Sequence, residues 1–200
     1  AMMRAGPAFQ WVGSQCEHAM VEPGKLADKI YSLPKDGVIN EQEAGLLVRS
    51  LLSAGFDTTV LSLTSIFYLF SQNSEQWPLL QDHKLLKRAF EEALRLEPPA
   101  RILARVVTEP TQIEKQSFEP GDHIVLGLTA AGRDPRRWND PDRFDIQRKP
   151  GPHLSFGAGI HTCIGQVLAR MEHEALFSVL SRRVARIEPI RAGGYVNGDL

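Results

Sequence analysis

The longest apolar pattern in the chain begins near Asn40 and persists to Phe70. Asn40 followed by Glu43 is a capping box, in which each side chain accepts a hydrogen bond from the other residue's backbone amide, so it predicts a helix start. A helix of roughly 30 residues spans about 45 Å. A soluble domain rarely uses a helix of this length unless the helix crosses the whole molecule.

Part of this segment, Ser50 to Phe70, would also pass a crude hydropathy test for a membrane span, because Asp57 is its single charged residue. An aspartate near the centre of a span costs roughly 2.5–3.5 kcal/mol on insertion scales. Hydroxyl side chains further weaken that interpretation: Ser50, Ser53, Thr58, Thr59, Ser62, Thr64 and Ser65. A helix buried in a large soluble protein has a similar composition. We therefore expect a buried helix and no membrane anchor in this chain.

The rest of the pattern predicts a mainly α-helical fold with minor β content. We expect helices over Pro23–Leu33, Ser74–Gln81, Leu85–Leu94 and Ile164–Leu180, and strands over Arg101–Thr108 and Ile124–Leu128. In the last helix, the side chains expected to face inward are Val167, Leu168, Met171, Ala175 and Val179. Residues 133–152 are rich in Asp, Pro and Arg without periodicity, and this composition predicts a loop.

The charge balance, 23 Lys and Arg against 24 Asp and Glu, argues against nucleic acid and against any strongly charged partner. Cys16 and Cys163 are far apart in sequence. Free thiols in a reducing compartment are the simpler interpretation, although a disulfide stays open. The start Ala1-Met2-Met3-Arg4 has no apolar run of the kind found in signal peptides, so we expect a cytoplasmic protein.

Cys163 lies near the end of a glycine-rich run that begins at Phe156 and contains Gly157, Gly159 and Gly165. Glycines at this density let a backbone approach a large flat ligand and adopt positive φ. A thiolate presented in this way can be an axial ligand of haem iron. The helix predicted to follow the cysteine favours the thiolate through the positive potential at its N-terminus. A buried structural cysteine in a turn is the alternative interpretation.

The run resembles the proximal signature of the cytochrome P-450 family at Phe156, Gly159, Cys163 and Gly165. Ala169, in the helix predicted to follow, also matches the signature. Two further segments resemble family motifs in the expected order. The Ala54–Thr59 segment is similar to the oxygen-activation stretch of the long distal helix, and Glu92 with Arg95 is similar to the Glu-x-x-Arg motif. The resemblance runs from about 23 to 189, so residues 1–200 are expected to form a single partial domain of this family.

The resemblance implies the cytochrome P-450 fold, with a long central helix, a proximal cysteine loop and a small mixed sheet. It implies haem b (iron protoporphyrin IX) as cofactor and Cys163 as the metal ligand, with Phe156 shielding its sulfur from water. Further positions that the resemblance assigns to haem binding are Gly157, Gly159, Gly165, Ala54, His161 and Arg105. Of these, His161 and Arg105 are the expected propionate partners.

The resemblance also assigns roles away from the cysteine. Glu92, Arg95 and Arg143 are expected to form a buried triad that braces the loop at 133–152, because an exposed pair three residues apart would contribute little. Asp57 and Thr58 are the expected catalytic residues: the Thr58 hydroxyl would hold a water, and Asp57 would relay protons to it. An acid and an alcohol at these positions favour a mono-oxygenase over a peroxide-driven enzyme. A buried polar pair bonding within its own helix is the alternative.

The implied function is a haem-thiolate mono-oxygenase of the soluble bacterial type that activates O₂ to hydroxylate a small apolar organic substrate. A ferredoxin or a flavoprotein would supply electrons, docking on a proximal face where Arg148, Lys149 and Arg170 carry positive charge; a solvated surface is the alternative for that patch. Complete family members are roughly twice this length. A truncated, non-catalytic fragment that binds haem weakly or not at all therefore stays open, as does an unrelated helical interaction protein.

Overall fold

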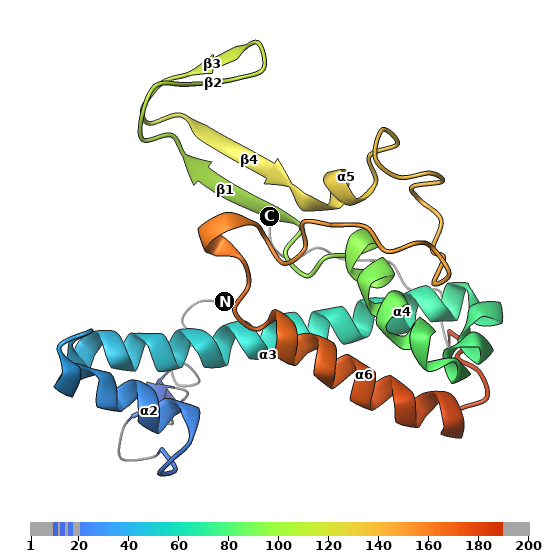
Figure 1. Cartoon of the computed structure of the whole chain (residues 1–200), viewed down its shortest axis with the longest axis horizontal. Coiled ribbons are helices and arrows are strands. Elements are labelled where there is room, and N and C mark those ends of the chain that lie inside the picture. The colour runs from blue at the N-terminus through green and yellow to red at the C-terminus, as the bar shows by residue number, and fades with distance from the viewer. Residues whose placement is uncertain (1–9, 12, 15, 18–20, 190–200) are drawn as a thin grey trace. The chain divides into compact units, whose positions relative to one another are not determined.

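The computed structural model describes residues 10, 11, 13, 14, 16, 17 and 21–189. The chain divides into two compact units, Ala1–Asp57 and Thr58–Leu200. Figure 1 labels the elements in chain order, beginning at α2. The predictions made from Ala1-Met2-Met3-Arg4 lie outside the described residues.

Helix α3 covers Glu41–Gln72 and is 32 residues long. Its capping box is formed as predicted: the Asn40 amide donates to a Glu43 carboxylate oxygen at 2.8 Å, and the Glu43 amide donates to the Asn40 side-chain oxygen at 2.9 Å. The start and the length of the helix therefore confirm the sequence prediction. The helix is the longest described element of the chain.

The burial expected for α3 is not observed within the described structure. This helix is long and apolar enough to cross a membrane by length and composition, yet only 11% of its most apolar window is buried. Phe56 is 68% exposed, and Leu46, Leu52 and Val60 are each about half exposed. These large apolar side chains therefore face solvent rather than a core.

The first unit folds around a short helix pair. Helix α2 (Leu26–Ser32), which lies within the predicted helix Pro23–Leu33, leads into the 3₁₀ turn η2 (Leu33–Asp36), and Gly37 ends the turn with φ 71°. Its small core contains Ile30, Tyr31, Ala44, Val48 and Cys16. The Tyr31 hydroxyl donates to the Cys16 carbonyl. Cys16 is buried and Cys163 is exposed, and both are free thiols in this structure.

The second unit packs the end of α3 against η3 (Ser74–Gln81), α4 (His83–Leu96) and α6 (Gln166–Arg183). All three were predicted as helices, although η3 is a 3₁₀ helix containing Pro78. The core is aromatic: the Phe70 ring makes edge contacts with Trp77 at 5.2 Å and with Phe144 at 5.3 Å, measured between ring centroids. These contacts bury a loop residue, Phe144, among helices.

The predicted inward face of α6 is wrong. Val167, Leu168 and Met171 are each at least 60% exposed, and Val179 is 40% exposed; Ala175 is also exposed. The buried side consists of His173, Phe177 and Ser181, spaced four residues apart. Both sides of this helix carry apolar residues, so periodicity alone does not tell which side meets the protein.

His173 is buried because it fits between two rings. Its ring stacks on Phe90 with centroids 3.7 Å apart and lies nearly parallel to Phe177. Its Nδ1 must donate to the Ala169 carbonyl, 2.8 Å away, because that oxygen only accepts. Burial lowers the pKa of His173 below its ordinary value, against the opposing effect of the Ala169 hydrogen bond. The histidine is therefore a neutral core residue.

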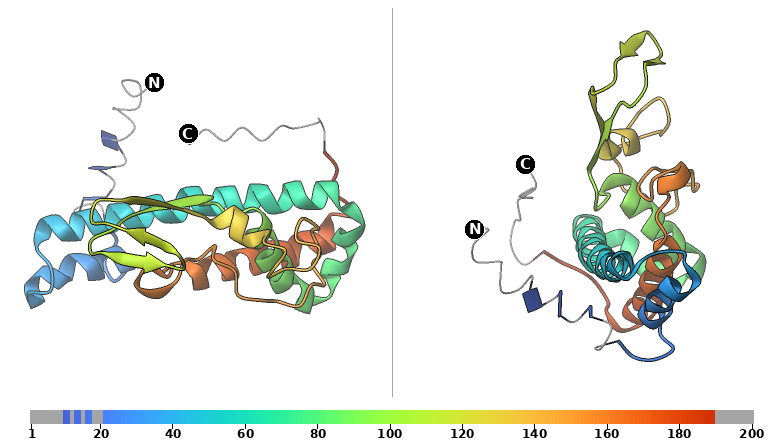
Figure 2. Two further views of the ribbon diagram at one scale, coloured as in Figure 1. Left: turned by 90° about the horizontal axis from the view of Figure 1, so that it is seen from above. Right: turned by 90° about the vertical axis from the view of Figure 1, so that its left-hand side faces the viewer.

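The described strands form two antiparallel pairs rather than the expected small mixed sheet. Strand β1 (Ile102–Val106) pairs with β4 (His123–Gly127), and β2 (Thr111–Ile113) pairs with β3 (Gln116–Phe118). The β2–β3 hairpin reverses the chain between β1 and β4, which makes that outer pair antiparallel as well. Figures 1 and 2 show the hairpin projecting away from α4 and α6.

The β2–β3 hairpin was not predicted. Its two-residue connection is Glu114-Lys115, and Glu114 adopts φ 54°. Tight hairpins usually place Asn or Gly at such positions, so the sequence carries no ordinary turn signal here. A short α5 (Leu128–Gly132) follows β4, and the loop of residues 133–152 follows α5 without helix or strand, as predicted.

Candidate haem-thiolate site

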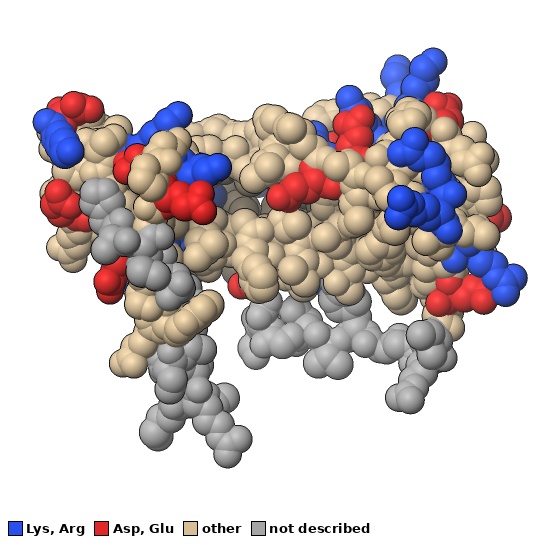
Figure 3. Space-filling view, turned by 90° about the horizontal axis from the view of Figure 1, so that it is seen from below, with Lys and Arg blue, Asp and Glu red and all other residues tan. Residues whose placement is uncertain are grey.

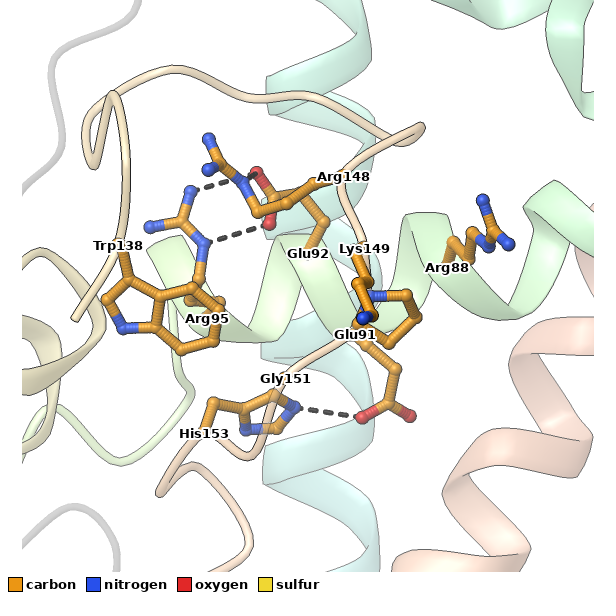
Figure 4. A pocket seen from close by; sticks show the side chains of 10 residues that line it. Arg88, Glu91, Glu92, Arg95, Trp138, Arg148, Lys149, Gly151 and His153 are labelled. Carbon is orange, nitrogen blue, oxygen red and sulfur yellow. Dashed lines mark hydrogen bonds and ion pairs between the residues drawn. The ribbon is translucent and has the colours of Figure 1, made fainter.

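The Glu92–Arg95 pair is fully formed and buried on α4. Two parallel hydrogen bonds of 2.8 Å join the Arg95 guanidinium to the two Glu92 oxygens. The side chains are 5% and 1% exposed. A bidentate arginine–carboxylate pair in this setting is strongly oriented, and removing one partner leaves the other charge buried. Figure 4 shows the pair with Trp138, whose ring lies 5.3 Å from the Arg95 guanidinium carbon.

The third side chain of this cluster is that of Arg148, which corrects the prediction of Arg143. Arg148 Nε donates to Glu92 Oε1 at 2.9 Å, and its side chain is only 15% exposed. Arg143 contributes its backbone carbonyl, which accepts from Arg95 and from Arg148 at 3.1 Å each, while its side chain is exposed. Both arginines come from the same aperiodic loop, so the sequence alone did not distinguish them.

The cluster holds the 133–152 loop through its backbone. Arg95 Nη1 donates to the carbonyls of Gly132 and Pro141, each at 2.6 Å, and the Asp145 amide donates to Glu92. Gln76 adds a second anchor, since it donates to the Phe144 carbonyl and accepts from the Ile146 amide. These bonds explain how some twenty residues without regular structure remain ordered.

The segment from Phe156 to Gly165, called the cysteine loop below, has a glycine-dependent shape. Gly157 and Gly159 adopt φ 71° and φ 64° before and within the 3₁₀ turn η4 (Gly159–His161). A Cβ at Gly157 would lie 2.8 Å from the His161 carbonyl oxygen, so only glycine fits this position. The Cys163 amide donates to the Phe156 carbonyl at 2.8 Å, which closes the loop.

Cys163 is exposed, three residues before the first residue of α6. A Cβ at Gly159 would meet nothing within 4 Å, and one at Gly165 would lie 3.8 Å from the Cys163 sulfur. The loop therefore presents the Cys163 thiol at the surface of the described structure. The alternative of a buried structural cysteine does not agree with this geometry.

A second carboxylate on α4, that of Glu91, binds one residue before the cysteine loop and one residue after it. His153 Nε2 lies 2.9 Å from Glu91 Oε2, and Arg170 Nε lies 2.6 Å from Glu91 Oε1. Burial raises the pKa of Glu91, but the hydrogen bonds from His153 and Arg170 outweigh that effect and lower it from 4.5 to about 2. Glu91 is therefore a carboxylate at neutral pH, and it joins α4 to residues on both sides of the cysteine loop.

The remaining predicted site residues are exposed. Ala54, Asp57 and Thr58 lie on α3, and His161 ends η4. Arg105 lies on β1, where its Nη1 donates to the Ala104 carbonyl at 2.8 Å. Their roles toward haem and O₂ stay predictions.

The donor set fits a single axial thiolate. Among the described residues, no group of three or more His, Cys, Asp or Glu side chains could hold a metal ion by itself. A haem brings its own four nitrogen ligands, so the protein needs to supply only an accessible sulfur and room for the ring. Cys163, an exposed free thiol, meets the first requirement.

Sequence reasoning missed Glu91 and His153, and it gave Arg148 and Arg170 a different role. Glu91 is next to the Glu-x-x-Arg motif, and His153 is three residues before Phe156, but nothing in their local pattern shows that they touch. A carboxylate beside a buried motif and a histidine beside a glycine-rich loop are the only available signals.

Comparisons with known proteins identify the family of the chain. The family model described as Cytochrome P-450 matches residues 69–183. A cytochrome P-450 of Rhodopseudomonas palustris is 40% identical over 94% of this chain and 46% of its own length. Luteothin monooxygenase of Streptomyces thioluteus is 33% identical over 96% of this chain and 47% of its own length.

A solved structure leads to the same result. The tirandamycin C-bound monooxygenase TamI, itself a cytochrome P-450, superposes with a TM-score of 0.81 at 35% sequence identity, covering 88% of this chain and 46% of that one. The present chain therefore spans about half the length of the relatives that it matches. An unrelated helical interaction protein is excluded, because the family match, the loop geometry and the fold agree: the chain belongs to the cytochrome P-450 family.

Proposed function

We propose that the chain is the haem-binding part of a haem-thiolate mono-oxygenase that inserts one oxygen atom from O₂ into a small apolar organic substrate. The observation that carries the proposal is the exposed Cys163 thiol, held by the Cys163–Phe156 backbone hydrogen bond in a glycine frame. The bound haem would supply the chemistry of O₂ activation. The chain's own residues would hold it and manage protons.

The protein residues have separable roles in this proposal. Cys163 Sγ would bind the haem iron, and Phe156 would shield the sulfur from water. His161 and Arg105 donate to the propionates, and both are exposed, as residues that reach a ligand must be. Asp57 and Thr58 both lie on α3, and in this proposal the Asp57 carboxylate relays protons to a water held at Thr58 Oγ1.

The electron donor would be a ferredoxin-type protein or a flavoprotein, and the protein would act in the cytoplasm. The basic patch first suggested for docking is weaker than the sequence indicates. Arg148 is bound to Glu92 and Arg170 is bound to Glu91, so Lys149 is its one member without a carboxylate partner among the described ion pairs. A donor that docks there would meet little uncompensated positive charge.

A second candidate is a fragment that binds haem weakly or not at all. Two observations favour it: the chain covers less than half of each relative's length, and the apolar residues of α3 and α6 are widely exposed. Figure 3 shows broad uncharged surface between groups of charged side chains. In that case the loop that carries Cys163 would already be formed, but the pocket around the haem would be incomplete.

One spectrum separates the two candidates. The purified chain, loaded with haem, reduced and exposed to carbon monoxide, should show the red-shifted Soret band of a thiolate-ligated haem. Cys163→Ala should abolish that band. Thr58→Ala should keep the band and uncouple O₂ consumption from product formation. A histidine-type band, or no haem uptake, would eliminate the mono-oxygenase proposal for this chain.

A further inference from the structure

Glu91 contacts the chain on both sides of the cysteine ligand. His153 precedes Cys163 by ten residues and Arg170 follows it by seven, yet both side chains end on the same carboxylate. Arg170 Nη2 adds a longer contact of 3.3 Å to Glu91 Oε2. Glu91 is part of α4, which is packed in the core. Its contacts with His153 and Arg170 therefore attach the chain on both sides of Cys163 to that helix.

The contact with His153 does not depend on a charged histidine. The Ser155 amide donates to His153 Nδ1 at 3.2 Å, so Nδ1 is an acceptor and the hydrogen of the neutral ring is on Nε2. That hydrogen points to Glu91, and Figure 4 shows the bond. The Ser155 hydroxyl donates to the Leu94 carbonyl at 2.7 Å, which fixes the same stretch of loop to α4 a second time.

The contact with Arg170 reaches Phe156. The Arg170 guanidinium carbon lies 4.5 Å from the centre of the Phe156 ring, within the range of a cation–π contact. Arg170 is 38% exposed, so without Glu91 its side chain would gain hydration by turning toward solvent. The Phe156 carbonyl accepts the hydrogen bond from the Cys163 amide. A chain of contacts therefore runs from Glu91 through Arg170 and Phe156 to the backbone of Cys163.

We propose that Glu91 is a positioning residue for the cysteine ligand: by holding His153 and Arg170 together, it fixes Phe156 and the backbone of Cys163. Arg170 thereby belongs to the support of the loop rather than to a docking patch. The inference deepens the proposed function, because its importance for catalysis rests on Cys163 being the haem ligand. The structural part of the claim concerns the loop itself and holds without haem.

The first test measures the loop without haem. Amide hydrogen exchange, read by NMR, compares the wild-type chain with Glu91→Gln and Glu91→Asp. The matched control is Glu174→Gln, which removes the same charge from the half-exposed Glu174 on α6, 3.6 Å from Lys87. The Phe177 amide, on the buried side of α6, reports global unfolding in every variant.

In Glu91→Gln, exchange of the Cys163 amide should accelerate by roughly tenfold or more, as the loss of charge-assisted hydrogen bonds predicts. The Phe177 amide should change much less. Glu91→Asp should restore part of the protection, and Glu174→Gln should behave as wild type. An unchanged Cys163 amide in Glu91→Gln overturns the proposal. So does equal acceleration at Cys163 and Phe177, because Glu91 would then only stabilise the fold.

The second test adds haem and reads the ligand. In Glu91→Gln the thiolate-type Soret band of the reduced carbon monoxide complex should convert in part to the band of a protonated or displaced thiol, whereas Glu174→Gln should keep the wild-type spectrum. An unchanged spectrum would contradict positioning of the ligand. If the wild-type chain takes up no haem, the proposed function fails for this chain, and the exchange experiment still decides the role of Glu91.

Discussion

Two adjacent glutamates on α4 support two different loops by the same chemistry at different depths. Glu92 is 5% exposed and binds Arg95 and Arg148, which hold the loop of residues 133–152. Glu91 is 25% exposed and binds His153 and Arg170, which flank the cysteine loop. The deeper cluster holds the loop of residues 133–152, and the shallower one holds the residues on either side of Cys163. Depth matters because a charge that loses its partner costs more where water cannot replace it.

Breaking the deeper cluster should have the largest effect. Glu92→Gln would leave Arg95 and Arg148 without their shared carboxylate, and we expect the free energy of unfolding to fall by about 3–5 kcal/mol. Urea unfolding followed by circular dichroism measures the loss. A decrease below about 1 kcal/mol would show that the buried charges find other partners and that burial does not separate the two clusters.

The shallower cluster should lose its contribution in acid. The folded-state pKa of Glu91 is about 2, below its ordinary value of 4.5. Its contribution, up to about 3 kcal/mol, is therefore complete above pH 4.5 and disappears as the pH falls toward 2. The difference in unfolding free energy between wild type and Glu91→Gln should shrink over this range. A difference that stays constant from pH 6 to pH 2.5 would contradict the ionised contacts.

The identity of the third arginine gives a smaller, more specific test. Arg148→Met should lower the free energy of unfolding by about 1–3 kcal/mol, since Arg148 donates to Glu92 from a mostly buried position. Arg143→Met should change it by less than about 0.5 kcal/mol, because only the Arg143 backbone carbonyl takes part. Equal losses in the two variants, measured by the same urea titration, would restore Arg143 as a side-chain partner.

The smallest effect is expected at the surface pair Lys87–Glu174, which also joins α4 to α6. The two charged atoms are 3.6 Å apart, and the side chains are 71% and 39% exposed. Glu174→Gln should therefore change the free energy of unfolding by no more than about 0.5 kcal/mol, and less in 0.5 M salt. If Glu174→Gln lowered the free energy of unfolding as much as Glu91→Gln does, side-chain exposure would not determine how much Glu92, Glu91 and Glu174 contribute to stability.

The predictable part of the fold comes from local signals. The capping box at Asn40 and Glu43 marks the start of α3, and the spacing of Glu92 and Arg95 places both on one helix face. The glycines around Cys163 indicate a loop of unusual backbone shape, which Gly157 and Gly159 adopt. In each case the interacting residues are a few positions apart, so their geometry follows from the helix or turn that contains them.

Tertiary structure decided everything that depends on partners distant in sequence. It selected Arg148 over Arg143, because the path of an aperiodic loop determines which side chain returns to Glu92. It buried His173 and Phe177 rather than Met171 on α6, because the neighbouring rings of α4 and η3 fit that side. It also brought His153 and Arg170 to Glu91. Sequence periodicity describes one segment at a time, whereas these contacts arise only when segments meet.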